Sequence, residues 1–139
     1  MKVKQFISTK AFIVHQGKVL ILRESKDYED GVNEGKYEIP GGRIEPGQKF
    51  DESLRREVME EAGLTINIGK PFHVGEWHPI IGGEECQIVA IFFECSSDSD
   101  KVALSKDHDK YLWIDPRDYK NHEMPLGSQD AFAEFLKNS

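Results

Sequence analysis

Apolar residues in this chain are collected into short runs, and polar segments that contain glycine separate the runs. Residues 6–14 and 19–23 are rich in β-branched and aromatic side chains, so they predict two strands joined by a turn at 15–18. The most continuous apolar run, CQIVAIFFEC at 86–95, predicts a central strand. Weaker strands are predicted at 65–69, 72–77 and 113–114.

Four apolar residues at a constant spacing predict an amphipathic helix that follows residue 49. Their separation of four positions places them on one face at about 100° per residue. They are Phe50, Leu54, Val58 and Ala62. The apolar stripe that they form indicates a helix packed against a core.

The end of the chain predicts a second helix at 128–138, with Ser128 as its N-cap. Its predicted buried stripe consists of Phe132, Phe135 and Leu136. Residues 24–35 have no apolar period and predict a long polar loop, a type that often acts as a lid. Strands and helices in this order are typical of an α/β sandwich, an α+β arrangement in which a mixed β-sheet lies between helices.

Composition favours one folded domain that covers residues 1–139. At 139 residues the chain is long enough to bury roughly two thirds of its unfolded surface, and 38% hydrophobic residues support a core. No run approaches the roughly eighteen apolar residues of a membrane span, so we expect a cytoplasmic protein without membrane contact. Cys86 and Cys95 point to opposite faces of one predicted strand, so we expect them to be reduced packing residues.

The formal net charge of −7 argues against binding of a nucleic-acid polymer, which requires a basic surface. Small phosphorylated ligands remain compatible, because bound cations would invert the local field. Arg23, Arg43 and Lys36 are the candidates for contact with phosphate oxygens. No apolar edge or heptad pattern decides between a monomer and a homodimer.

The densest charge in the chain lies at Glu57, Glu60 and Glu61. On a helix, Glu60 and Glu61 lie about 60° and 40° to either side of Glu57, so one narrow arc carries three negative charges. A solvated acidic face is one interpretation. Binding of a divalent cation such as Mg²⁺ is the other, because these residues border the apolar stripe and should sit in a partly enclosed place.

Residues 42–64, GRIEPGQKFDESLRREVMEEAGL, resemble the Nudix box in the spacing of glycine, arginine and glutamate. The matching residues are Gly42, Arg56, Glu57, Val58, Glu60, Glu61, Gly63 and Leu64. Upstream, residues 36–47 with Glu38 resemble the strand and loop that lead into the box in the MutT branch. The chain is therefore similar to MutT-like members of the Nudix hydrolase superfamily, and this resemblance also implies the sandwich fold.

Two positions depart from the family pattern. Gln48 stands where the family has a glutamate that usually pairs with the box arginine, here Arg56. The amide oxygen can still accept a hydrogen bond from the guanidinium but without charge assistance, so we expect weaker support for the loop. Lys49 stands where many members have Ser or Thr as the helix cap, which predicts a poorer helix start.

The resemblance also implies a set of site residues. Glu57, Glu60 and Glu61 would bind Mg²⁺, or alternatively Mn²⁺, together with the carbonyl oxygen of Gly41. Arg56 would orient Glu57 or Glu61. These residues are expected to form the metal site.

A segment downstream of the box, residues 104–114, resembles one that often supplies a further acidic ligand or base. Asp107 is its best match, and Asp109 is the reserve. Asp107 or one of the box glutamates would take the proton from water, and the sequence does not decide which.

The implied activity is Mg²⁺-dependent hydrolysis of a nucleoside diphosphate linked to another moiety, by attack of water on phosphorus. The expected substrate is a nucleoside triphosphate, in a MutT-like pyrophosphohydrolase reaction. ADP-ribose and dinucleoside polyphosphates are alternative substrates. A nucleotide-binding module with weakened catalysis is the alternative function.

Overall fold

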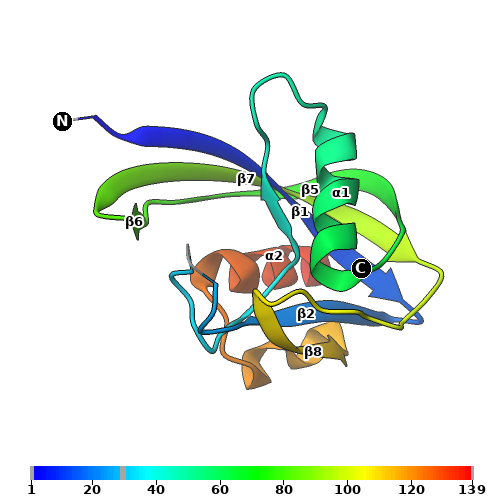
Figure 1. Cartoon of the computed structure of the whole chain (residues 1–139). Coiled ribbons are helices and arrows are strands. Elements are labelled where there is room, and N and C mark those ends of the chain that lie inside the picture. Colours follow the sequence, from blue (N-terminus) through cyan, green and yellow to red (C-terminus); the bar gives the residue numbers. More distant parts are fainter. Residues whose placement is uncertain (1, 29–30, 139) are drawn as a thin grey trace.

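The computed structural model describes residues 2–28 and 31–138 (Figure 1). Positions 29 and 30, within the loop predicted at 24–35, lie outside the described residues. In chain order the elements are β1 (Lys4–His15), β2 (Lys18–Glu24), β3 (Tyr37–Glu38), β4 (Gly41–Arg43), α1 (Phe50–Ala62), β5 (Ile66–Trp77), β6 (Ile80–Ile81), β7 (Glu84–Ser97), β8 (His108–Ile114), a 3₁₀ helix (Pro116–Asn121) and α2 (Leu126–Lys137).

The sheet is built on β1. This strand runs parallel to β7, from Lys4 opposite Cys86 to Val14 opposite Ser96. Its pairings with β2 and β4 are antiparallel, as are those of β2 with β3 and β8 and of β5 with β7. The sheet is therefore mixed, as predicted. β7 lies between β1 and β5, which confirms the central strand expected at 86–95.

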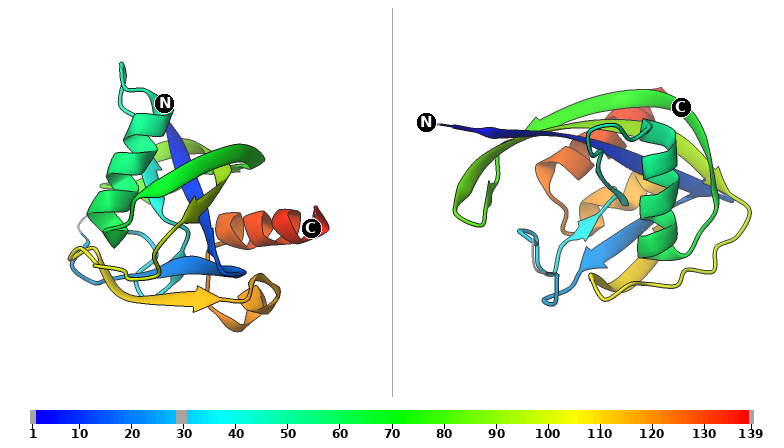
Figure 2. Two further views of the ribbon diagram at one scale, coloured as in Figure 1. Left: turned by 90° about the vertical axis from the view of Figure 1, so that its right-hand side faces the viewer. Right: turned by 45° about the horizontal axis from the view of Figure 1, so that its top comes forward.

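Side chains that alternate along the strands form two apolar clusters, one for each helix. On β1, Ala11 and Ile13 belong to the cluster that includes Leu54 of α1. Phe12, between them, belongs to the cluster that includes Phe132 of α2. Figure 2 (left) shows the strands between the two helices. The predicted sandwich is confirmed.

Helix α1 buries the predicted stripe except at its first residue. Leu54, Val58 and Ala62 are fully buried, whereas Phe50 is 47% exposed. The Phe50 ring stacks on Phe93 with 5.3 Å between the centroids. Lys49 occupies the N-cap with no side-chain hydrogen bond, as predicted. Gly63, at φ 68°, ends the helix in the left-handed conformation that glycine adopts easily.

The two strands predicted at 65–69 and 72–77 are one strand, β5. Its register shifts around Pro71, which has no N–H to donate. β5 pairs only with β7 in the described sheet and forms its edge, where a missing donor is least costly. The proline therefore interrupts the register without ending the strand.

Helix α2 begins at Leu126, two residues earlier than predicted, with Pro125 as its N-cap. Ser128 is consequently buried within the first turn and does not cap the helix. Phe132 is fully buried, and Phe135 and Leu136 pack partly buried against the same cluster. Within the described residues, no helix combines the length and apolar character needed to span a membrane.

Strand β1 changes its antiparallel partner halfway along, and we call this place the fork. Residues 8–10 pair with β4, whereas residues 14–15 pair with β2. Between them, the N–H of Ala11 donates to the carbonyl oxygen of Pro40 at 2.8 Å. Helix α1 packs against β4 beside this divergence. The fork therefore brings together β1, β4 and α1, the acidic helix that carries Glu57, Glu60 and Glu61.

Candidate metal centre

Glu57 and Glu61 lie one turn apart on α1, and two glycines of β4 allow both carboxylates to approach the fork. The N–H of Gly41 donates to Oε1 of Glu61 at 3.0 Å. At Gly42, an added β-carbon would lie 2.8 Å from the carboxyl carbon of Glu57. A larger residue at either position would displace a carboxylate or the strand that supports it.

His108 and Glu38 complete the cluster at the fork. Nε2 of His108 lies 2.7 Å from Oε1 of Glu38 and 3.8 Å from Oε2 of Glu61. One potential ligand atom from each of the three residues lies within 4.8 Å of the others. The cluster therefore joins α1 to strands β3 and β8.

Sequence reasoning missed His108 and noted Glu38 only as a family match. The two residues are 70 positions apart in the chain. They meet because β3 and β8 both pair with β2, and no local pattern reports such a contact. The available signal was the position of His108 directly after Asp107, in the segment already singled out.

Burial is the strongest influence on these charges. The Glu61 side chain is only 14% exposed, and burial followed by the charge of Glu38 raises its pKa to about 8, against the opposing effects of His108 and Lys10. Burial also raises the pKa of Glu38, but its hydrogen bond with His108 and the positive charges of Lys10 and His108 together leave the pKa below the usual value. Burial lowers the pKa of His108, and the two carboxylates raise it above the usual value. Glu61 therefore ionises readily only where a further positive charge is supplied.

Glu57 is more open than Glu61, with its side chain 23% exposed and Nη2 of Arg56 3.4 Å from its Oε1. Burial raises the pKa of Glu57, and the charges of Glu60 and Asp107 add to the rise. Glu60 is exposed, which corrects the expectation that all three glutamates are partly enclosed. Glu60 lies about 60° from Glu57 on the side of the helix away from the apolar stripe, whereas Glu61 lies on the side towards the stripe.

The loop before α1 is closed differently from the sequence expectation. Oε1 of Gln48 accepts a hydrogen bond from the N–H of Glu45 at 2.9 Å, and the hydrogen bond of Arg56 is with Glu57. The expectation of a bond from Arg56 to Gln48 is therefore wrong. The Gln48 side chain instead supports the loop by accepting a hydrogen bond from the loop backbone at Glu45.

The residues considered for phosphate contact have other partners in this structure. Nε of Arg23 lies 2.7 Å from Oδ1 of Asp109, so the reserve acidic residue is engaged with it. The guanidinium of Arg43 lies 3.9 Å from the centre of the Phe6 ring. In the part of the chain that the structure describes, Lys36 is fixed only through its backbone, where its carbonyl accepts the N–H of Glu24 at 3.0 Å. None of these contacts of the described residues involves the box glutamates.

The residues at the fork fit a divalent metal ion. They offer carboxylate oxygens and an imidazole nitrogen, which hard and borderline cations accept. Among the described residues, the hydroxyls of Thr9 and Ser53 and Nδ1 of His108 are buried without a hydrogen-bond partner. Thr9 pairs with Gly42 across β1 and β4, so its hydroxyl, which has no hydrogen-bond partner among the described residues, lies next to the glutamates. Burying several carboxylates together is unfavourable unless a cation compensates them.

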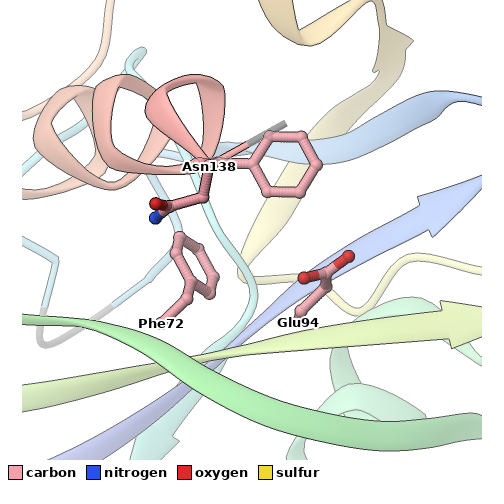
Figure 3. A pocket seen from close by; sticks show the side chains of 4 residues that line it. Phe72, Glu94 and Asn138 are labelled. Carbon is pink, nitrogen blue, oxygen red and sulfur yellow. The ribbon is translucent and has the colours of Figure 1, made fainter.

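A pocket of about 150 Å³ lies elsewhere, at the end of α2 beside β5 and β7 (Figure 3). It is lined by Phe72, Glu94, Phe135 and Asn138. None of these residues carries a positive charge that would neutralise a phosphate. None belongs to the candidate metal centre either, so the pocket is separate from it.

Known proteins resemble this chain over nearly its whole length. Residues 6–135 match the NUDIX domain family. The nucleoside triphosphatase NudI of Klebsiella pneumoniae (strain 342) is 27% identical over 132 residues, which are 88% of this chain and 90% of that protein. The crystal structure of the MutT protein from Methanosarcina mazei Go1 has a TM-score of 0.86 and 29% identity, and the match covers 99% of this chain and 97% of that one.

The fold is shared with a protein named for a different activity. An ADP-ribose pyrophosphatase from Streptococcus suis 89-1591 has a TM-score of 0.69 and 18% identity, and the match covers 96% of this chain and 92% of that one. At that identity the likeness extends to the fold alone. Because the family match from residue 6 to residue 135 includes β1, β4, α1 and β8, the chain belongs to the NUDIX domain family and is a Nudix hydrolase.

Proposed function

We propose that the protein hydrolyses nucleoside triphosphates to a nucleoside monophosphate and pyrophosphate, with Mg²⁺ or Mn²⁺ as cofactor. The observation that carries this proposal is the clustering of Glu38, Glu61 and His108 at the fork, beside Glu57. The names of two relatives, a nucleoside triphosphatase and a MutT protein, support the substrate class.

The box residues would hold the cofactor. A divalent cation bound there supplies charge neutralisation for the phosphoanhydride and acidifies water. Glu57, Glu60 and Glu61 are the proposed ligands, with the carbonyl oxygen of Gly41. The Gly41 N–H fixes one oxygen of Glu61, and Arg56 steadies Glu57. Glu61 and Glu57 are thus each oriented by a neighbouring group.

Asp107 is the proposed acceptor of the proton from the attacking water. It is half-buried, and its charge reaches both Glu57 and His108. Its backbone is fixed on both sides, because its carbonyl accepts the N–H of Ser25 at 2.8 Å and its N–H donates to Oγ of Ser105 at 3.3 Å. A general base needs this kind of positioning. The box glutamates are the alternative bases.

Arg43 and Arg23 are proposed to contact phosphate oxygens. Arg43 follows Gly42 directly on β4, so it is anchored beside the glutamates. Arg23 would have to leave its ion pair with Asp109. That pair is more than a third exposed on both sides, and exposed pairs of this kind are weak, so exchange for a phosphate is not prevented.

The test is release of phosphate and pyrophosphate from a panel of substrates, with Mg²⁺, with Mn²⁺ and with EDTA. The panel contains nucleoside triphosphates, oxidised purine nucleotides, ADP-ribose and dinucleoside polyphosphates. We expect metal-dependent release of pyrophosphate from a nucleoside triphosphate. Turnover of ADP-ribose or of a dinucleoside polyphosphate alone would move the assignment to that class. Nucleotide-induced thermal stabilisation without turnover of any substrate would indicate a binding module.

A further inference from the structure

Lys10 stands at the fork, and sequence reasoning gave it no role. It pairs with Gly41 across β1 and β4, and it is the last residue of β1 to pair with β4. The next residue, Ala11, already donates its N–H to Pro40. Lys10 is half-buried. Its backbone position is therefore fixed at the point where the strands diverge.

The side chain of Lys10 runs along a glycine that belongs to the candidate metal centre. A β-carbon added at Gly41 would lie 3.0 Å from Cδ of Lys10 and 2.8 Å from its Cα. Gly41 has φ 150°, so a larger residue would be strained as well as crowded. The same glycine binds Glu61 through its N–H. The stem of Lys10 and the carboxylate of Glu61 thus share one small residue as their neighbour.

The positive charge of Lys10 acts on four carboxylates at once. They are Glu24, Glu38, Glu57 and Glu61. In the described part of the chain, however, the ammonium group of Lys10 forms no ion pair, because no carboxylate oxygen lies within 4.0 Å of its nitrogen. Lys10 therefore faces the acidic cluster without being committed to one partner.

We propose that Lys10 binds the phosphate chain of the substrate at the fork, a specific contact within the proposed function on which it rests. Once the carboxylates are compensated by a divalent cation, they no longer attract the ammonium group strongly. A phosphate oxygen held at the same centre is then the nearest unmatched negative charge. A lysine ammonium, a compact charge with three donors, suits this contact.

The test compares Lys10→Met and Lys10→Arg with the control Lys18→Met. Lys18 lies at the exposed start of β2, so the control makes the same change of charge away from the cluster. Titration calorimetry measures the affinity for Mn²⁺ alone, and then for inorganic pyrophosphate at saturating Mn²⁺. We expect Lys10→Met to weaken pyrophosphate binding at least tenfold while Mn²⁺ binding stays equal or becomes tighter, because a like charge has been removed. Lys10→Arg should recover most of the loss.

Kinetics with the best nucleoside triphosphate provide the second arm. Lys10→Met should raise KM more than it lowers kcat, and Lys18→Met should change neither. Unchanged pyrophosphate affinity in Lys10→Met, or a wild-type protein that does not bind pyrophosphate, overturns the inference. So does an equal loss of Mn²⁺ affinity, which would make Lys10 a structural support. The calorimetric arm needs no turnover, so failure of nucleoside triphosphate hydrolysis refutes the proposed function separately.

Discussion

Glu60 and Glu61 are neighbours in the chain, yet the fold gives them opposite surroundings. Glu60 is exposed, whereas Glu61 is enclosed by Gly41, Glu38 and His108. The 100° step between adjacent helix residues accounts for the difference, because it turns one side chain away from the sheet. The two carboxylates should therefore contribute unequally to catalysis, although the family motif contains both.

Replacement of Glu61 by glutamine tests that inequality. Glu61→Gln removes the charge but keeps the shape, so we expect kcat to fall on the order of a hundredfold or more, as for loss of one strong electrostatic contact at a transition state. In EDTA its melting temperature should equal or exceed that of the wild type, because an amide is easier to bury than a carboxylate. Steady-state kinetics and thermal unfolding provide the two measurements.

Glu60→Gln is the matched comparison, because it makes the same chemical change on the exposed side of the helix. We expect a smaller loss of kcat than for Glu61→Gln. An equal or larger loss of kcat would show that the exposure of each glutamate in this structure does not indicate how much it contributes to catalysis.

At the scale of elements, α1 is positioned by backbone contacts and by its apolar stripe, and its start is weakly stabilised. Lys49 has the extended backbone of an N-cap, with φ −78° and ψ 138°, but no side-chain bond to the first turn. At the other end, the close approach of β4 sets where the glutamates lie. The start of the helix can therefore be stabilised without altering the part that carries the glutamates.

Lys49→Ser supplies the missing cap. A serine hydroxyl can accept a hydrogen bond from an N–H of the first turn, so we expect a gain of about 1 kcal/mol in the free energy of unfolding. Urea denaturation measures it, with Lys49→Ala as the control that removes the lysine without adding an acceptor. A similar gain in both variants would assign the effect to loss of the lysine and not to capping.

Gly42→Ala tests the approach of β4 to α1. The added methyl group would lie 2.8 Å from the carboxyl carbon of Glu57, so the carboxylate or the helix must shift. We expect kcat/KM to fall at least tenfold, with weaker binding of Mn²⁺ measured by calorimetry. Gly17→Ala, in the turn after β1, has open space around the new methyl group but a φ of 77°. This control should lose stability and keep its activity.

For the whole molecule, the buried acidic cluster predicts how stability depends on pH. The pKa of Glu61 is raised to about 8 from an ordinary 4.5. Between these values the folded protein keeps a proton that the unfolded chain releases, so the free energy of unfolding falls as pH rises. The raised pKa of His108 acts in the same direction above its ordinary 6.5, and the lowered pKa of Glu38 matters only below its ordinary 4.5.

We therefore expect the metal-free protein to lose stability from about pH 5 to pH 8, by on the order of 1 kcal/mol per pH unit. Urea denaturation in EDTA at several pH values measures the slope. Saturating Mn²⁺ and the Glu61→Gln variant should each flatten it. A stability that rises over this interval would contradict the assignment of Glu61 as a buried carboxyl group.

Features that follow from local spacing were predictable from the sequence, and features that depend on strand pairing were not. The apolar stripe of α1 and the central strand β7 follow from local periodicity. The contact of His108 with Glu38 and the position of Lys10 beside Gly41 depend on pairings between distant segments. The start of α2 was misplaced because Ser128 is a good cap by residue type, whereas the actual N-cap, Pro125, makes no side-chain capping bond.

The pairing of β1 with β7 also determines when the enzyme becomes complete during its synthesis. Residues 4–14 leave the ribosome long before their parallel partners at 86–96 have been made. The acidic helix emerges in the interval, and His108 emerges later still. A nascent chain shorter than this carries the glutamates but neither the central strand nor the closed cluster, and such long-range pairing is slow. Metal binding at the fork should therefore follow the synthesis of β7 and β8 and not that of the acidic helix alone.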